Sequence, residues 1–525
     1  MLRTSAALLL CALACGRARV QAVDGAPDAT VGAGLPDAAV PSADGGAQAS
    51  PDAGPVTYQI ARVALHVHSA ISHDACDHHG TNGGPLVSLD QDCLDQLEAA
   101  LCSQRIDIAF LTDHPRYMDS KPIEDDVLLR GRGEQPLRDA SGAVIGAQLP
   151  CGTQMAPGWE GTHTMPLGLT RQLTDAESNA YGTHTDNTET LADMQAALAT
   201  VHAAGGIYFT AHSEEPDLPE TVLEQLQTDG MEWYNIHGNF IALLGGQGDL
   251  LTGPSPLAVI TAIKDLEPFL LGGHAAADLA YLPLLKVHFP EVGLQKWTQV
   301  LGARFIAAGL GNDVHRNVSV APLCKGAVLM ALCQAASTLY PNVLTALAAG
   351  GQLLLSDGER LDSYARVLRW LNNRALVTSM DIAAAREAMG RGRSYGVFAV
   401  LGEPGPVSFQ ARAADGTLLQ MGDSAPAAGA TLLLRLPDPP APDLGPQWTA
   451  QDAARAQLHA VLWRGGEQVA AFDTWSAAVE FPVDQPGRYW LEVRVVPRHL
   501  DALAGGSDLT SAEYRWVLMN PIDLK

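Results

Sequence analysis

Short apolar runs recur along the first 315 residues, and five of them end beside a histidine or a carboxylate. The runs are residues 60–65, 106–111, the segment that leads to Gly158-Trp159-Glu160, 206–211 and 305–310. Their length and uninterrupted apolar character are typical of buried β-strands. We therefore expect five short strands, each with a polar side chain capable of chemistry at or just beyond its end.

Between these runs, apolar residues recur at helical spacing. Leu94, Leu97 and Leu101 lie three and four positions apart within residues 93–104 and form one apolar face. The same character marks residues 190–204, 326–339 and 364–371. Alternation of strands and helices predicts an α/β fold built on parallel β/α units.

The pattern changes after about residue 405. Strand-like segments separated by Gly, Pro and Asp follow at residues 407–411, 431–436, 458–463 and 489–496. This spacing predicts a small C-terminal β-sandwich-like domain. We assign residues 57–404 to the α/β domain and residues 405–525 to a β-rich domain that caps it. Recognition of a glycan or of substrate is the alternative role for that domain.

The N-terminal segment predicts export. Arg3 precedes a short apolar run, and Ala12-Leu13-Ala14-Cys15 resembles a bacterial lipobox, so residues 1–15 read as a lipoprotein-type signal peptide with Cys15 as the candidate lipidation site. Cleavage after Ala22 is the alternative and also predicts export. Residues 16–56 are rich in Ala, Asp, Gly and Pro and predict a disordered tether. We expect a bacterial lipoprotein that faces the periplasm or the cell exterior and touches the membrane only through its lipid.

Net charge limits the kinds of partner that the protein can bind, and the cysteine content indicates possible disulfides. The net charge of −25 argues against duplex nucleic acid as a partner, because binding to its phosphates depends on Lys and Arg. The expected partner is a small-molecule substrate. Six cysteines follow Cys15, which permits three disulfides in an exported protein. Their pairing stays open, with Cys324–Cys333 as one candidate.

The polar residues that follow the strands suit divalent metals. His66 and His68 are two positions apart, so their side chains point to the same side of a strand. Functional residues of a β/α barrel come from the carboxyl ends of several strands. Histidines and carboxylates are ligands for zinc, manganese and iron. The candidate metal ligands are His66, His68, Asp74, His114, Glu160, His163, His212, Asp313 and His315.

The order of these motifs resembles the PHP (polymerase and histidinol phosphatase) superfamily. The matching elements are His66-Val67-His68 with Asp74, Thr112-Asp113-His114, Glu160, Ala211-His212 and Gly311-Asn312-Asp313-Val314-His315. Two further motifs resemble the extracytoplasmic CehA/McbA-like hydrolases of that superfamily. They are Gly392-Arg393-Ser394-Tyr395 and Asn520-Pro521-Ile522.

The resemblance implies a distorted (β/α)7 barrel, the PHP fold, that holds two or three divalent metal ions (Zn, Mn or Fe). The implied ligand sets are His66, His68, Glu160 and Asp313 for one ion, Glu160, His163 and His212 for a second, and Asp74, His114 and His315 for a third. His184 is the alternative to His163. Three residues are expected to act in catalysis: Asp113 as an orienting group or proton acceptor, His212 beside the ions, and Arg316 as a contact for a phosphate oxygen.

This ligand set predicts hydrolysis by metal-activated hydroxide, because divalent ions lower the pKa of bound water from 15.7 towards about 7. Phosphoesters suit such a site best, since their displacement depends on positioning and charge neutralisation. A metal-dependent hydrolase of carboxylic or carbamic esters is the first alternative. A non-catalytic surface-binding lipoprotein is the second.

Overall fold

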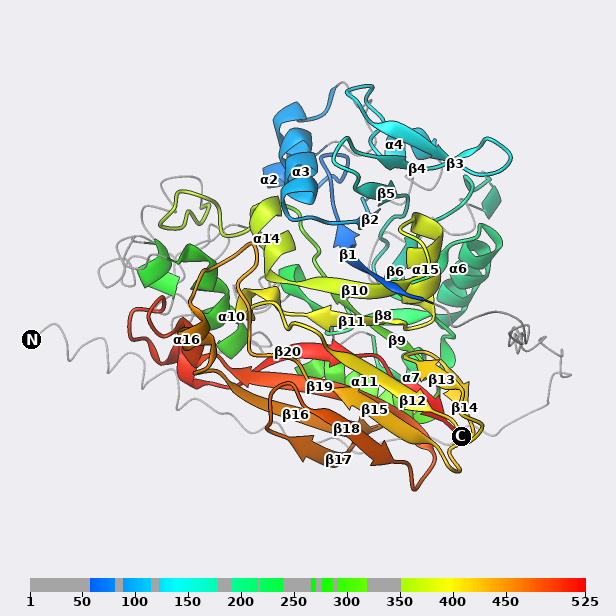
Figure 1. Cartoon of the computed structure of the whole chain (residues 1–525). Coiled ribbons are helices and arrows are strands. Elements are labelled where there is room, and N and C mark those ends of the chain that lie inside the picture. The colour runs from blue at the N-terminus through cyan, green and yellow to red at the C-terminus, as the bar shows by residue number, and fades with distance from the viewer. Residues whose placement is uncertain are drawn as a thin grey trace, which may run out of the picture. The chain divides into compact units, whose positions relative to one another are not determined.

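The structure is a computed structural model that describes ten stretches of the chain. They are residues 57–80, 88–114, 122–174, 176–177, 190–215, 218–238, 266–270, 276–287, 291–318 and 351–525. Residues 56–525 form one unit (Figure 1). Several predictions lie outside the described residues: the signal peptide with Cys15, the tether, His184, the helix at 326–339, and Cys324 with Cys333.

The described strands form three sheets. A 13-stranded sheet contains β1 Gln59–Val67, β2 Ile108–Leu111, β3 Gln135–Arg138, β4 Val144–Gln148, β5 Gln154–Ala156, β10 Asn372–Val377, β11 Ser394–Val397, β14 Ser424–Ala425, β16 Gln457–Arg464, β17 Glu467–Phe472, β19 Gly487–Val496, β20 Tyr514–Met519 and β21 Ile522–Leu524. The second sheet contains β6 Thr164–Leu167, β7 Ile207–Thr210, β8 Gly230–Asn235 and β9 Ala307–Gly311. The third contains β12 Ser408–Arg412, β13 Leu418–Gln420, β15 Thr431–Arg435 and β18 Ala478–Pro482.

Helices connect and cover these strands. The α-helices are α2 Ala75–His78, α3 Gln91–Ser103, α4 Ile123–Asp126, α6 Leu191–Ala203, α7 Glu220–Gln225, α10 Tyr281–Val287, α11 Glu291–Ala303, α14 Tyr364–Trp370, α15 Ile382–Gly390 and α16 Ala450–Ala453. Short 3-10 helices span Ala277–Ala280, Ala399–Leu401, Arg498–Leu500 and Asp508–Ser511. No helix in the described ranges has the length and apolarity needed to cross a membrane.

The expected helices at residues 93–104 and 190–204 are confirmed. Leu94, Leu97 and Leu101 are buried along α3, which begins where the Asp90 side chain accepts a hydrogen bond from the amide of Cys93. A capping box between Thr190 and Asp193 begins α6. Side-chain caps of this kind satisfy amides that lack a partner within the helix, and they fix where each helix begins.

Parallel pairing is confirmed in two places. β1, β2 and β5 are parallel neighbours, and so are β7, β8 and β9. β6 departs from the expected parallel arrangement, because it pairs antiparallel with β7. Isolated bridges join Gly158 to Leu167 and Val67 to Val314. The fold is therefore mixed α/β with several sheets, and the strands that carry the candidate ligands are neighbours.

The first sheet continues across the expected boundary at residue 404. β11, which precedes that position, pairs antiparallel with β20, which lies more than 100 residues beyond it. β12, β13, β15 and β18 form a separate antiparallel sheet. The β-rich character of residues 405–525 is confirmed, and the sandwich arrangement stays a prediction.

Asn520 ties the C-terminal strands to the strand that carries Asp313. Its Oδ1 accepts a hydrogen bond from the amide of Ala308 at 2.6 Å, and its Nδ2 donates to the carbonyl of Ala308 at 3.0 Å. The same Nδ2 lies 2.9 Å from the carbonyl of Ser394. Two motifs that resemble the family, around Ser394 and Asn520, thus meet in the interior beside β9.

Candidate metal centre

The histidines at the end of β1 introduce two adjoining sets of potential metal ligands. His66 Nε2 and His68 Nε2 lie 2.9 Å apart. In each set, one ligand atom per residue lies within 4.8 Å of all the others. The Glu160 group is His66, Glu160, His212 and Asp313, and the Asp74 group is His68, Asp74, His114 and His315. Eight of the nine expected ligands therefore converge.

The two groups share two carboxylates at their boundary. Glu160 Oε2 lies 3.0 Å from His66 Nε2, 3.1 Å from His68 Nε2 and 3.2 Å from His114 Nε2. Asp313 Oδ1 lies 3.3 Å from the Nε2 atoms of both His66 and His68. The grouping differs from the expected ligand sets, since His68 falls with the Asp74 group and His212 joins His66.

The chemistry of this donor set fits divalent cations. All four carboxylate oxygens of Glu160 and Asp313 are buried, and none accepts a well-aligned hydrogen bond from the described residues. Buried carboxylates without such partners are costly unless a cation balances them. Four carboxylate oxygens, ringed by imidazole nitrogens at 2.8–3.7 Å, therefore suit Zn, Mn or Fe.

Electrostatics favour the metal-binding protonation state at His68 and Glu160. At His66, His212 and His315 burial alone would lower the pKa, but the neighbouring carboxylates raise it well above its ordinary value. Burial and the neighbouring His315 lower the pKa of His68 to about 4, so its imidazole is neutral at pH 7. Burial alone would raise the pKa of Glu160, but His66, His212 and His114 hold it well below its ordinary value. A neutral imidazole and an ionised carboxylate are the forms that bind metals.

Exposure divides the ligands into a floor and a rim. The side chains of His66, His68, Glu160 and Asp313 are fully buried, whereas His114, Asp74 and His212 are 23%, 24% and 18% exposed. The rim residues come from loops that follow β1, β2 and β7. Closed coordination is typical of structural metal sites, and an accessible position is typical of catalytic ones.

Two ligands adopt strained backbone conformations. His212 has φ 50° and Asp313 has φ 44°, in the left-handed region that side chains other than glycine rarely adopt. Both follow the last residues of parallel strands, where a sharp turn brings the side chain back over the strand ends. Strain of this kind is held by surrounding structure and is concentrated at functional sites.

Glu232, in the middle of β8, is a functional candidate that the sequence reasoning missed. It is fully buried, and its Oε1 accepts a hydrogen bond from His66 Nδ1 at 2.7 Å. Its Oε2 accepts from the amide of His212 at 3.2 Å. The contact fixes the His66 tautomer and leaves Nε2 free for a metal. The available signal was a lone carboxylate inside an apolar strand, Met231-Glu232-Trp233.

Asp113 follows β2, lies outside both groups and holds the backbone just after β1. Its carboxylate accepts hydrogen bonds from the amide and the hydroxyl of Ser69, at 2.5 Å and 2.8 Å. Burial raises the pKa of Asp113 to about 6. These bonds hold the residue that follows His68, in keeping with the orienting role expected for Asp113.

His163 and Arg316 lie near the centre without belonging to either group. His163 is buried, and its carbonyl accepts a hydrogen bond from the amide of Ala211, next to His212. Arg316 is half-buried with φ 54°, and its Nε has no hydrogen-bond partner among the described residues. The ligand role of His163 and the substrate role of Arg316 stay predictions.

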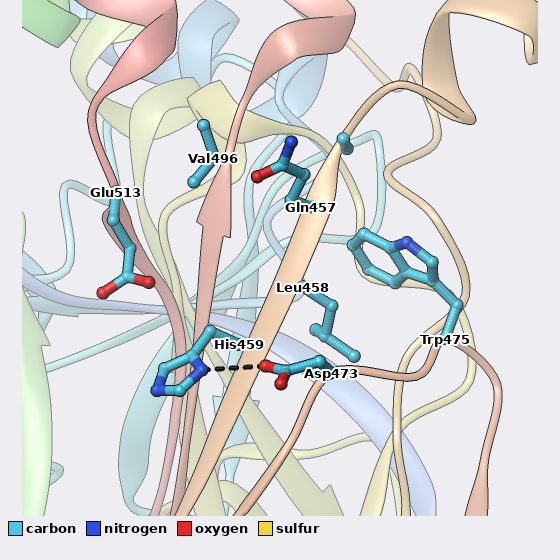
Figure 2. Close-up of a pocket in the computed structure, with 8 residues that line it drawn as sticks. Gln457, Leu458, His459, Asp473, Trp475, Val496 and Glu513 are labelled. Carbon is cyan, nitrogen blue, oxygen red and sulfur yellow. Dashed lines mark hydrogen bonds and ion pairs between the residues drawn. The ribbon is translucent and has the colours of Figure 1, made fainter.

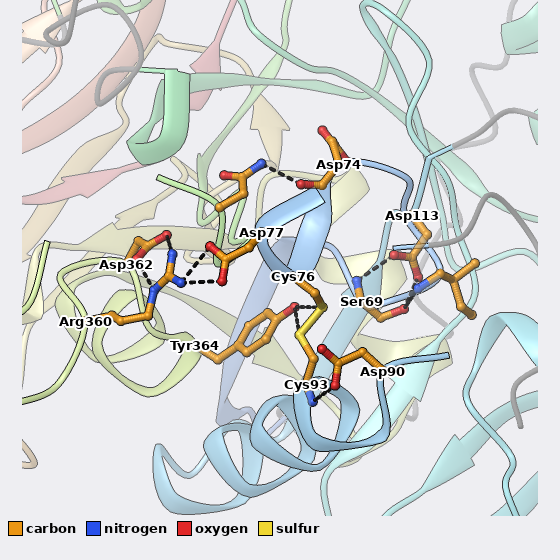
Figure 3. Close-up of a disulfide and its surroundings, with 12 residues drawn as sticks. Ser69, Asp74, Cys76, Asp77, Asp90, Cys93, Asp113, Arg360, Asp362 and Tyr364 are labelled. Carbon is orange, nitrogen blue, oxygen red and sulfur yellow. Dashed lines mark hydrogen bonds and ion pairs between the residues drawn. A yellow bond between two sulfur atoms is a disulfide. The ribbon is translucent and has the colours of Figure 1, made fainter. Parts of the chain in front are cut away.

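A disulfide-anchored turn carries Asp74. Cys76, Asp77 and His78 all have positive φ, so this segment is a left-handed turn, and Cys76 is bonded to Cys93 in α3. The amide of Cys76 donates to the carbonyl of His315 at 2.9 Å. Figure 3 shows Tyr364 beside the two sulfur atoms.

An ion pair holds the side of this turn that faces away from the disulfide. Asp77 accepts two hydrogen bonds of 2.7 Å from Arg360, whose Nε also donates to Asp362 (Figure 3). Asp362 in turn accepts from the amide of Val318 at 2.6 Å. Asp74 and His315 are thereby attached to the same turn. Asp74 Oδ2 lies 3.1 Å from His315 Nε2.

Comparisons with known proteins are sparse. No protein-family model matches the chain, and no curated protein matches it. Among solved structures, a two-domain protein from Bacteroides vulgatus, described as containing a predicted PHP-like metal-dependent phosphoesterase, is similar at 11% identity. The match covers 88% of this chain and 96% of that one, with a TM-score of 0.29.

Proposed function

We propose that this protein is a metal-dependent hydrolase of the PHP type that cleaves phosphoesters. The observation that carries the proposal is the pairing of two adjoining ligand groups with a buried floor and a partly exposed rim. When bound, divalent ions supply Lewis acidity and lower the pKa of water. The Glu160 group and the Asp74 group would hold them.

The protein's own residues would perform the remaining tasks. Glu232 holds the ring of His66, and Asp113 holds the backbone after His68. The guanidinium of Arg316, two residues from Val314 on the β9 side of the site, would contact a non-bridging phosphate oxygen. Planar guanidinium groups suit that contact because they donate two parallel hydrogen bonds.

We further propose that β1, β2, β5, β6, β7, β8 and β9 make up the distorted seven-stranded barrel expected of this type. The two isolated bridges support the proposal, because they link the segment after β5 to the end of β6 and the end of β1 to the segment after β9. Export as a lipoprotein is also proposed. The disulfides Cys76–Cys93 and Cys102–Cys151 support it, since such bonds persist in oxidising compartments.

Metal analysis combined with an ester panel tests the activity. The purified protein is stripped with a chelator, reloaded with Mn or Zn, and assayed on nitrophenyl phosphate, bis-nitrophenyl phosphate, nitrophenyl acetate and a nitrophenyl carbamate. We expect bound metal and hydrolysis of the phosphoesters. Activity confined to acetate or carbamate would favour the carboxylic or carbamic ester hydrolase instead.

His68→Ala links activity to the site. We expect it to lose metal and to lower turnover at least about 100-fold, because His68 contacts both shared carboxylates. His202→Ala is the matched control, since His202 is 45% exposed and pairs only with Asp229 among the described residues. Unchanged turnover in His68→Ala would eliminate both enzymatic proposals and leave the binding lipoprotein.

A further inference from the structure

A hollow lies in the β-rich region, far along the sequence from the candidate metal ligands. It has a volume of about 470 Å³, within the range of small-molecule sites. Its lining includes Gln457, His459, Asp473, Trp475, Val496 and Glu513. Figure 2 shows Trp475 and Asp473 on one side of β16, with Val496 and Glu513 on the other.

The hollow lies where β17 stops pairing with β16. β16 pairs with β19 from Gln457 to Arg464, but β17 pairs with β16 only from Ala460 onward. The segment 457–459 therefore has no strand partner on the β17 side among the described residues. The chain after β17 turns away and places Asp473 and Trp475 across from that open edge (Figure 2).

The polar groups of the hollow are already paired within the protein. Asp473 Oδ1 accepts a hydrogen bond from His459 Nδ1 at 2.9 Å. Glu513 Oε2 lies 3.3 Å from Nη1 of Arg494. Each carboxylate therefore has a nitrogen partner, and the hollow presents both donors and acceptors of hydrogen bonds. Such a lining suits hydroxyl groups, which both donate and accept.

The aromatic wall supplies the apolar contact. Trp475 is half-buried and packs edge-on against the buried Trp516, with ring centroids 6.0 Å apart. That contact orients the indole while part of its surface stays accessible. Trp475 also combines a large apolar body with an N–H donor. A sugar ring offers the complementary surface, since it has an apolar C–H face and a rim of hydroxyl groups.

We propose that this hollow binds the pyranose ring of a neutral glycan, with Trp475 against the ring face and Asp473, Gln457 and Glu513 on its hydroxyls. The site does not depend on the metal centre. It would hold the protein on a polysaccharide or glycoconjugate surface.

Saturation-transfer NMR with methyl pyranosides tests the proposal on the full chain. The panel is the methyl glucoside, galactoside, mannoside and N-acetylglucosaminide. We expect at least one to bind, with a dissociation constant of roughly millimolar order for a single ring. Asp473→Ala and Trp475→Ala should each weaken that binding at least about tenfold. The metal-loaded activity on nitrophenyl phosphates should be unchanged in both variants.

Matched controls distinguish this site from general surface adhesion. Asp473 and Asp484 have side-chain exposures of 74% and 78%, so Asp484→Ala is an equivalent surface change outside the hollow. It should leave glycoside binding intact. Binding of no glycoside, binding equally strong in Asp473→Ala, or preferential binding of tetramethylammonium would each overturn the proposal.

Discussion

At the scale of single residues, the shared carboxylates govern the site. Glu160 and Asp313 each lie beside four imidazoles. Burial alone would lower the pKa of His66, but the negative charge of these carboxylates raises it well above its ordinary value. The two ligand groups thus form a network of buried opposite charges. Cations would replace protons in that network, so metal occupancy should depend steeply on pH.

Glu232→Gln should lower metal affinity by about 10- to 100-fold, because the amide orients the His66 ring less strongly than the carboxylate does. Metal competition with a chromophoric chelator measures the affinity. Glu387→Gln is the control, since Glu387 is 54% exposed and its ion pairs among the described residues are with Arg391 and Arg393, outside both ligand groups. Wild-type affinity in Glu232→Gln would show that Glu232 serves packing alone.

His499 provides a pH-dependent element outside the metal centre. It is buried, its Nε2 donates to the carbonyl of Leu401 at 3.1 Å, and burial lowers its pKa to about 4. In the unfolded chain its pKa is near 6.5, so the unfolded state binds the extra proton between pH 6.5 and 4. Stability contributed by neutral His499 is therefore complete above that window and is lost as pH falls through it.

His499→Gln should remove about 3 kcal/mol of this acid sensitivity while the amide keeps the donor. Chemical denaturation at pH 7 and about pH 4.5, in chelator so that metal loss does not contribute, measures the difference. An identical pH dependence in variant and wild type would contradict the assignment.

At the scale of elements, the left-handed turn 76–78 is the scaffold of the Asp74 group. Its disulfide to Cys93 and the Arg360 pair with Asp77 hold it on opposite sides. The other described disulfide, Cys102–Cys151, starts in the same helix, α3, and leads away from the site. The two bonds form a natural comparison.

Removing either disulfide should cost roughly 3–4 kcal/mol of stability, from loop closures of 17 and 49 residues. Only the Cys76→Ala/Cys93→Ala variant should also weaken metal binding at the Asp74 group, because only that bond anchors the ligand-bearing turn. Metal titration at a temperature where both variants remain folded separates the effects. Equal metal affinity in the two variants would mean that Arg360 suffices to hold the turn.

The elements that sequence patterns predicted are those whose apolar residues follow a single period. β1, β2, β7, β9, α3 and α6 were found because one face or the whole element is buried. The antiparallel strand β6 was not predicted at all, because four buried residues, Thr164–Leu167, are too short to show a period. Pairings such as β11 with β20 depend on contacts between distant segments that no local pattern encodes.

The same limit applies to the site. Motif order picked out all eight residues of the two groups as candidate ligands, because strand ends concentrate polar side chains at one edge. It did not reveal how His68 and His212 are divided between the groups, since that depends on turns at His212 and Asp313 with positive φ. Glu232 was missed because it acts from inside a strand.

At the scale of the whole molecule, Asn520 connects the C-terminal strands with the metal centre through Ala308, five residues before Asp313. Residues 405–525 therefore contribute structure to the site-bearing strands as well as a surface of their own. Activity and the integrity of the last strands should be inseparable.

Asn520→Ala should lower the free energy of unfolding by about 2–4 kcal/mol, since it leaves the buried amide and carbonyl of Ala308 without partners. Thermal and denaturant unfolding measure the loss. Gln447→Ala is the control, because Gln447 also donates to two backbone carbonyls but is exposed and should cost less than about 0.5 kcal/mol. A comparable effect of both changes would contradict the linking role of Asn520.

The 212 residues that separate Ala308 from Asn520 also constrain the order of folding. A chain that folds from its N-terminus leaves the edge of β9 open until the strand end that carries Asn520 docks, and chains with such open edges are prone to misassociate. Ion loading should accordingly be a late event, and metal uptake followed during refolding should lag behind the formation of the N-terminal strands.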